Sequence, residues 1–152
     1  MTILHRLLLA STVLLAFGCS PKINPIAGIK NTSWEPMYVA NTKGLKIPSD
    51  AKRPARLNFD KNLNITGFDG VNEFSASCAL KRKPIRRSEC KICVSEIACS
   101  KASEDFADYE KVFLDDIKNA DAIRLSANKL EFLKGRKLLI EFKRVPHELK
   151  RK

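Results

Sequence analysis

Short runs in which apolar residues alternate with polar ones fill most of the chain, and this period of two limits the possible folds more than any other feature. Alternation of this kind is typical of strands that bury one face and expose the other. The runs that show it are 34–40, 55–60, 63–67, 73–80, 90–97, 122–126, 129–133 and 137–145. Asp60-Lys61-Asn62 predicts a tight hairpin between the second and third of these runs.

One segment departs from the alternation, because its large apolar residues recur at helical spacing. They are Phe106, Tyr109, Phe113 and Ile117, and they predict an amphipathic helix over 103–119. Hydrophobic residues make up 44% of the 152 and charged residues 30%, a balance that excludes an intrinsically disordered chain. We therefore expect an α+β domain, an antiparallel, incomplete β-barrel of about eight short strands with one covering helix.

The first residues have the pattern of an export signal. Eleven uncharged residues, 7–17, follow Arg6, and they are too few to span a bilayer as a helix. This run ends at Gly18-Cys19, which resembles the bacterial lipobox, where a small residue precedes a cysteine that receives lipid. We predict a lipoprotein signal peptide over 1–18 and lipidation of Cys19; cleavage by the ordinary signal peptidase is the alternative.

The rest of the chain divides by composition. Residues 19–30 are rich in proline and glycine and are expected to form a tether. Residues 31–145 are expected to fold, and 146–152 to form a basic tail. Ser20, rather than an aspartate, follows Cys19, and this resembles the default signal for sorting to the outer membrane. We expect the protein to be lipid-anchored at the periplasmic face of the bacterial outer membrane.

Four segments follow one another in an order that resembles a known family. They are Thr32-Ser33-Trp34, then Gly67-Phe68-Asp69-Gly70-Val71-Asn72-Glu73-Phe74, then Ser95-Glu96-Ile97-Ala98-Cys99, and finally the helical 110–117. These segments resemble the opening Trp strand, the Gly-x-x-Gly-Cys-Asn-x-Phe motif, the Thr-x-Met-Ala-Cys motif and the helix of the META domain family, the HslJ-like envelope lipoproteins associated with heat shock. The chain departs from the family at Val71, where the family has cysteine.

The resemblance implies a small β-rich domain with no established catalytic residues and an association with the stress response of the envelope. Its motif residues, Trp34, Gly67, Gly70, Asn72 and Phe74, are expected to be structural. The two glycines would permit a bulge or turn and Asn72 would bond to local backbone. A ligand-binding role for Asn72 is the alternative.

Four cysteines remain beside Cys19, and an oxidising compartment favours two disulfides among them. A hairpin about Pro84-Ile85 would join Cys78 to Cys90 and leave Cys93 with Cys99, although four cysteines allow three pairings. A redox-active CxxC at 90–93 and a four-cysteine zinc site are the alternatives.

Acid–base chemistry has little support in the sequence. Beyond the signal peptide the only histidine is His147, in the basic tail, so neither a Ser-His-Asp nor a Cys-His set is available from the folded region. Acidic residues of the predicted helix are expected on its solvated face: Glu104, Asp105, Asp108, Asp115 and Asp116. We expect no enzyme, no cofactor and no metal.

The formal net charge is +11, and six of the eleven residues 81–91 are basic. This run is either an anionic-lipid contact or a solubilising loop. The export signal disfavours nucleic acid, so the expected partners are the membrane, through the N-terminal lipid, together with anionic lipid or an envelope protein. The leading hypothesis is a non-enzymatic protein that supports outer-membrane integrity or stress tolerance by binding or scaffolding. The alternatives are a carrier or pilot module for an acyl chain or peptide, and a thiol oxidoreductase using Cys90 and Cys93.

Overall fold

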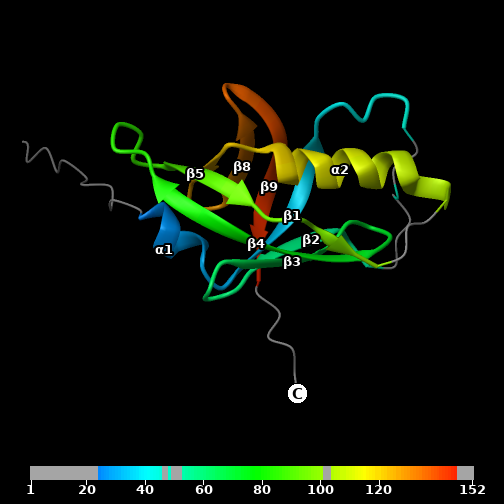
Figure 1. Ribbon diagram of the computed structural model, residues 1–152, viewed down its shortest axis with the longest axis horizontal. Coiled ribbons are helices and arrows are strands. Elements are labelled where there is room, and N and C mark those ends of the chain that lie inside the picture. The colour runs from blue at the N-terminus through cyan, green and yellow to red at the C-terminus, as the bar shows by residue number, and fades with distance from the viewer. Residues whose placement is uncertain (1–23, 46–47, 49–52, 101–103, 147–152) are drawn as a thin grey trace, which may run out of the picture.

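A computed structural model describes residues 24–45, 48, 53–100 and 104–146 (Figure 1). The predictions for 1–18, Cys19 and residues 147–152 lie outside this part of the chain. The strands are β1 (Thr32–Val39), β2 (Arg56–Phe59), β3 (Asn64–Phe68), β4 (Glu73–Arg82), β5 (Glu89–Val94), β6 (Ala98–Cys99), β7 (Ala122–Leu125), β8 (Lys129–Lys134) and β9 (Lys137–Val145). The helices are α1 (Pro25–Ile29) and α2 (Ala107–Asn119), with a 3-10 turn at Glu104–Phe106 before α2.

Eight of these strands form a closed antiparallel barrel in the order β3-β2-β1-β9-β8-β7-β5-β4, and the β3–β4 pairing completes the ring. The incomplete barrel expected from the sequence is therefore wrong, although the antiparallel strands and the single long helix are confirmed. Closure depends on the ten-residue β4, which pairs with β3 along one edge and with both β5 and β6 along the other. The extra strand β6 continues the edge begun by β5 after an interruption at 95–97.

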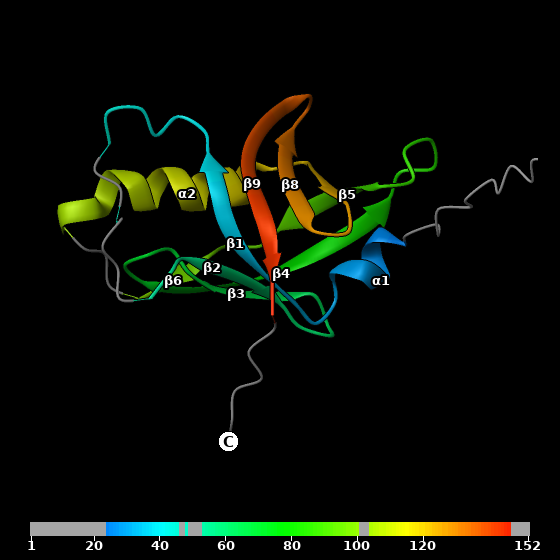
Figure 2. The same ribbon diagram turned by 180° about the vertical axis from the view of Figure 1, so that it is seen from behind.

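Aromatic side chains fill the barrel. Trp34, Phe59, Phe132 and Phe142 are fully buried, and Phe113 of α2 joins them. The Phe113 ring centroid lies 6.0 Å from that of Phe74 and 6.4 Å from that of Phe142, both at edge-on angles that favour aromatic pairs. The apolar stripe of α2 therefore belongs to the same core as the strands, and the helix runs across the barrel (Figures 1 and 2).

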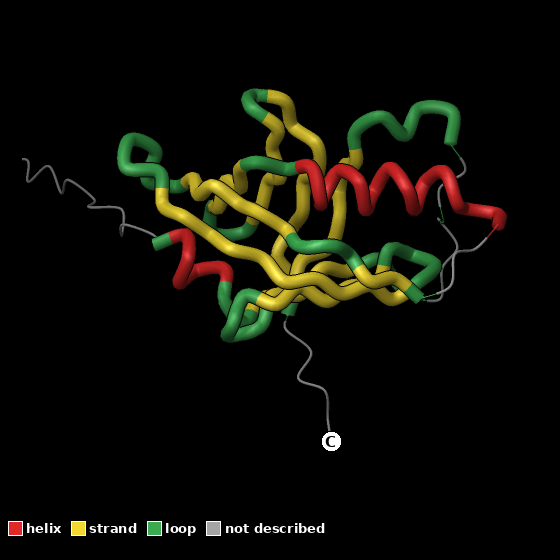
Figure 3. The backbone as a smooth tube through the Cα atoms, viewed as in Figure 1, coloured by secondary structure: helices red, strands yellow, loops and turns green. Residues whose placement is uncertain are grey.

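The second helix was not expected. Residues 19–30 were predicted to be a tether, but Pro25–Ile29 forms α1, with Asn24 Oδ1 accepting a bond from the Ile26 amide at 3.3 Å. Ile29 is fully buried in the core, and the Thr32 hydroxyl donates to its carbonyl while accepting from the Trp34 indole at 2.7 Å. The packed region thus begins before residue 31, and α1 and α2 lie toward opposite ends of the molecule (Figure 3).

The long helix also begins differently from the prediction over 103–119. Its N-cap position is Phe106, which makes no side-chain capping bond, and the preceding turn at Glu104–Phe106 has 3-10 geometry. Among the described residues, neither helix has the length and apolar character needed to cross a membrane.

Candidate functional site

The β3–β4 connection carries the central motif, and its geometry accounts for glycine at two positions. A Cβ on Gly67 would lie 2.2 Å from the Phe74 ring and 2.6 Å from the Arg56 carbonyl oxygen, so no side chain fits there. Gly70 has a φ of +109°, which L-residues rarely adopt. Phe74 then enters the core, 3% exposed.

Asn72 does not make the local backbone bond that was expected of it. That role falls to Asp69, whose Oδ1 accepts from the amides of Val71 and Asn72, each at 2.7 Å. The Asn72 side chain instead donates to Glu110 Oε2 at 3.1 Å, which links the turn to the first turn of α2. The motif therefore lies at a contact between the β3–β4 turn and α2 rather than within one turn alone.

An acidic cluster forms at this contact from Asp69, Cys99 and Glu110. One ligand atom from each lies within 4.8 Å of the others, and the Cys99 thiol donates to Glu110 Oε1 at 2.9 Å. Asp69 is fully buried and Glu110 is 5% exposed, while Cys99 is exposed at one side. Burial raises the pKa of Asp69, and the Glu110 charge adds to this effect; burial and the bond to Glu110 raise the pKa of Cys99 to about 12.

Sequence reasoning missed Asp69 and Glu110 as a pair. Glu110 lies beside Tyr109 on the apolar stripe of the helix, and a charged residue on such a stripe was the available signal.

Among the helix acids that were expected on the solvated face, Asp116 is instead buried, 9% exposed. Its Oδ2 has no hydrogen-bond partner among the described residues, and burial raises its pKa.

The four described cysteines are free thiols, so the expected disulfides are absent from this part of the chain. The reason is strand register. Cys78 lies opposite Val94, and Cys90 lies opposite Arg82, four positions along the strand and thus about 13 Å away, beyond the reach of a disulfide. Cys93 and Cys99 face positions five residues apart on β4, which excludes the second pair in the same way.

The CxxC segment lies entirely within β5, which separates its two sulfurs. Cys90 is fully buried inside the barrel, whereas Cys93 is exposed, because residues three apart on a strand point to opposite faces. Burial also raises the pKa of Cys90. This arrangement does not support disulfide exchange between the two, and it does not gather the four cysteines around a zinc ion.

The β4–β5 hairpin carries a basic surface, defined here as Lys81, Arg82, Lys83, Arg86, Arg87 and Lys91. Ile85 lies in its loop and is 93% exposed. Glu89 is the acidic residue within it and binds three cations, Lys83 at 3.4 Å, Arg86 at 3.1 Å and Arg124 at 2.9 Å. No ion pair involving another described residue neutralises the remaining four, Lys81, Arg82, Arg87 and Lys91.

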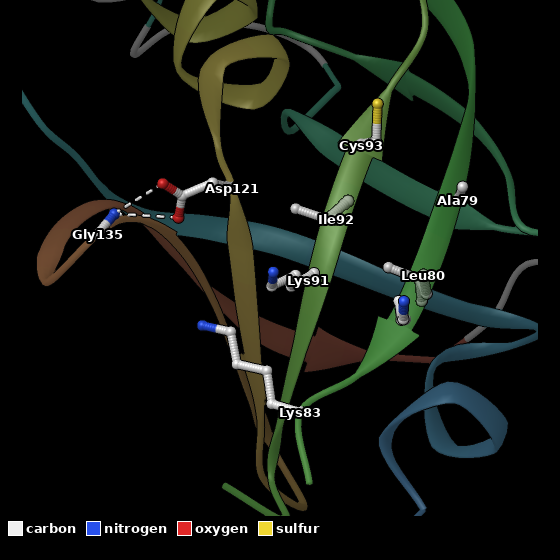
Figure 4. Close-up of a pocket in the computed structure, with 9 residues that line it drawn as sticks. Ala79, Leu80, Lys83, Lys91, Ile92, Cys93, Asp121 and Gly135 are labelled. Carbon is white, nitrogen blue, oxygen red and sulfur yellow. Dashed lines mark hydrogen bonds between the residues drawn. The ribbon is translucent and has the colours of Figure 1, made fainter. Parts of the chain in front are cut away.

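The basic surface continues into an open groove of about 600 Å³ (Figure 4). Ala79, Leu80 and Ile92 give it apolar walls, and three lysines of the basic surface border it. On the side of β7 and the β8–β9 turn, both carboxylate oxygens of Asp121 accept from the Gly135 amide at 3.0 Å. Groups that are anionic at one end and apolar at the other match this lining.

The family model for the META domain matches residues 27–146. An NMR structure of a protein from Burkholderia xenovorans is similar in fold, with a TM-score of 0.59 and 18% identity over 95% of this chain and 99% of that chain. A second NMR structure has a TM-score of 0.53 and 19% identity, covering 78% of this chain and 92% of that one. No curated protein matches the sequence.

Proposed function

This chain belongs to the META domain family, and from that premise we propose that it is a non-enzymatic protein of the bacterial envelope, anchored through lipid on Cys19. In this proposal it supports outer-membrane integrity or stress tolerance by holding its barrel against an anionic membrane surface. The basic surface of the β4–β5 hairpin makes the contact.

The observation that carries the proposal is the position of this hairpin relative to α1. Both lie at the same end of the molecule in two opposite views (Figures 1 and 2). Helix α1 contacts β4 and β5 as well as β7. Asn24 lies five residues after Cys19, so at most about 18 Å of chain separates the described domain from the proposed anchor. An anchor at Cys19 would therefore bring the basic end of the barrel close to the bilayer.

The interaction energies favour adhesion rather than insertion. Each basic residue near an anionic leaflet contributes about 1 kcal/mol, and four residues of the basic surface have no competing ion pair among the described residues. Ile85 adds about 1.5–3 kcal/mol when its exposed side chain leaves water. Two or three acyl chains on Cys19 would already attach the protein stably, so an additional contact of this size would orient the domain on the membrane surface.

The interior of the barrel supports surface binding over the carrier alternative. A carrier would need a cavity within the strands, but Trp34, Phe59 and Phe132 are fully buried there together with Phe113 and Phe142. The open groove beside the hairpin is where the acyl chain or peptide of that alternative would have to bind.

Two experiments test the two parts of the proposal separately. Radiolabelled palmitate should enter the wild-type chain in cells and should not enter a Cys19→Ala variant. Palmitate absent from the wild type would refute the anchor. The Cys19→Ala chain is then used to measure binding of the hairpin to vesicles without help from the lipid.

In the vesicle experiment, Cys19→Ala chain should sediment with vesicles of phosphatidylcholine and phosphatidylglycerol, and not with phosphatidylcholine alone. Adding Arg82→Ala and Arg87→Ala should weaken binding about 30-fold, since two residues at about 1 kcal/mol each are removed. Lys43→Ala with Lys111→Ala removes the same charge at exposed positions elsewhere and serves as the control. Equal losses in the two double variants would mean that net charge, not this surface, causes the binding.

A further inference from the structure

The acidic cluster of Asp69, Cys99 and Glu110 brings together three groups that can each carry negative charge. Two carboxyl groups and a thiol converge from three elements, the β3–β4 turn, β6 and the first turn of α2. Among the described residues, none of the three forms an ion pair with a lysine or arginine. An unpaired carboxylate costs several kcal/mol to bury, so such a site requires either bound protons or a bound cation.

An independent observation points to a missing ligand. Asp69 is fully buried, and although its Oδ1 accepts two backbone amides, its Oδ2 has no hydrogen-bond partner in the described structure. Buried carboxylate oxygens are normally satisfied by a donor or a metal. Asp69 Oδ2 is thus a buried acceptor without a donor, and it belongs to a carboxylate that takes part in the cluster.

We propose that Asp69, Cys99 and Glu110 bind one zinc ion. Zinc accepts thiolate and carboxylate ligands together, whereas calcium and magnesium take oxygen ligands alone and usually six or more of them. Three protein ligands leave a fourth position on the ion, which a water molecule can fill. Asn72, which donates to Glu110 Oε2, orients the carboxylate from outside the ligand set.

Zinc binds the thiolate of Cys99, so the thiol proton leaves to solvent and binding strengthens as pH rises.

The test uses the full chain in mild detergent, freed of metal with a chelator that is then removed. Zinc chloride should bind with a stoichiometry of one per chain in a calorimeter. Cobalt chloride should give a thiolate-to-cobalt charge-transfer band together with the visible absorption of a four-coordinate ion. Cys99→Ser should abolish that band and lower zinc affinity at least about tenfold, because even outer-shell partners are worth 10–100-fold.

Cys93→Ser is the matched control, since it removes an exposed thiol outside the cluster and should leave affinity and spectrum unchanged. Glu110→Gln gives a second reading that does not depend on sulfur, and it should also weaken zinc at least about tenfold. The proposal is overturned if wild-type chain binds no zinc, if the cobalt complex lacks the thiolate band, or if Cys93→Ser weakens zinc as much as Cys99→Ser does.

Discussion

Replacing Glu89 by glutamine tests whether one buried carboxylate holds the base of the hairpin together. Glu89 opens β5, its side chain is 4% exposed, and it receives bonds from Arg124 Nη2 at 2.9 Å and Arg86 Nη1 at 3.1 Å. Lys83 approaches it at 3.4 Å. Glu89→Gln keeps the size and one carbonyl oxygen of the side chain but removes its charge.

The expected cost lies between two limits. Breaking a fully buried ion pair costs about 3–5 kcal/mol, while an exposed pair contributes about 0.2–1 kcal/mol. The three partner side chains are 28%, 54% and 43% exposed, so water screens each of them when the carboxylate is lost. We expect Glu89→Gln to lower the free energy of unfolding by about 2 kcal/mol, which corresponds to about 6 °C in Tm for a domain of this size.

The effect should disappear in acid. Burial raises the pKa of Glu89, but the bonds from Arg124 and Arg86 outweigh it and hold the pKa below its usual value. A carboxyl group with a lowered folded-state pKa stabilises fully above its unfolded-state pKa, and this stabilisation is lost as pH falls through the folded-state value. The difference between wild type and Glu89→Gln should therefore be full at neutral pH and should shrink as pH falls through the folded-state pKa of Glu89.

Urea unfolding at a series of pH values, followed by the fluorescence of the single tryptophan, measures this difference. Glu96→Gln is the control, because Glu96 pairs with Lys118 but its side chain is 87% exposed, and its loss should cost less than about 0.5 kcal/mol. If Glu89→Gln costs no more than Glu96→Gln, or if its cost persists in acid, the assignment of Glu89 as the central residue of this ion-pair network is wrong.

Two further predictions concern packing and thiol reactivity. Gly67→Ala should destabilise the fold by about 1–3 kcal/mol. Adding Phe74→Leu should restore only part of this stability, because the Arg56 carbonyl oxygen still lies 2.6 Å from the new Cβ. Full recovery of the urea midpoint would contradict the contact with the Arg56 carbonyl oxygen. Iodoacetamide should modify the exposed Cys93 in the native protein. Cys78, whose pKa burial raises to about 12, should react only after unfolding. If peptide mass spectrometry finds that the two cysteines are modified at equal rates in the native protein, the burial of Cys78 is wrong.

Local patterns predicted the strands well, and contacts between distant segments explain where prediction failed. Alternation identified the runs that became β1 to β5 and β7 to β9, and the hairpin at Asp60-Lys61-Asn62 is present between β2 and β3. Closure of the barrel could not be predicted this way, because it depends on β4 pairing along both edges. α1 was missed because five residues with a proline and a glycine have no helical periodicity of their own and are held by the core.

The candidate sites show the same division. The basic run at 81–91 was visible in the sequence, and the structure added its position on a hairpin near α1. The cysteine pairing failed because Cys78 lies opposite Val94, four positions along β5 from Cys90. The acidic cluster could not be predicted, since the approach of Asp69 to Glu110 is set by how α2 packs on the barrel.

The pairing of β1 with β9 has a consequence for biosynthesis. β1 lies between β2 and β9, which is made more than a hundred residues later, with Ser33 opposite Val145. Contacts between such distant segments form slowly, because the intervening chain must first be brought together. A nascent chain of this protein therefore cannot complete the barrel until β9 has emerged, even though β1 was made long before.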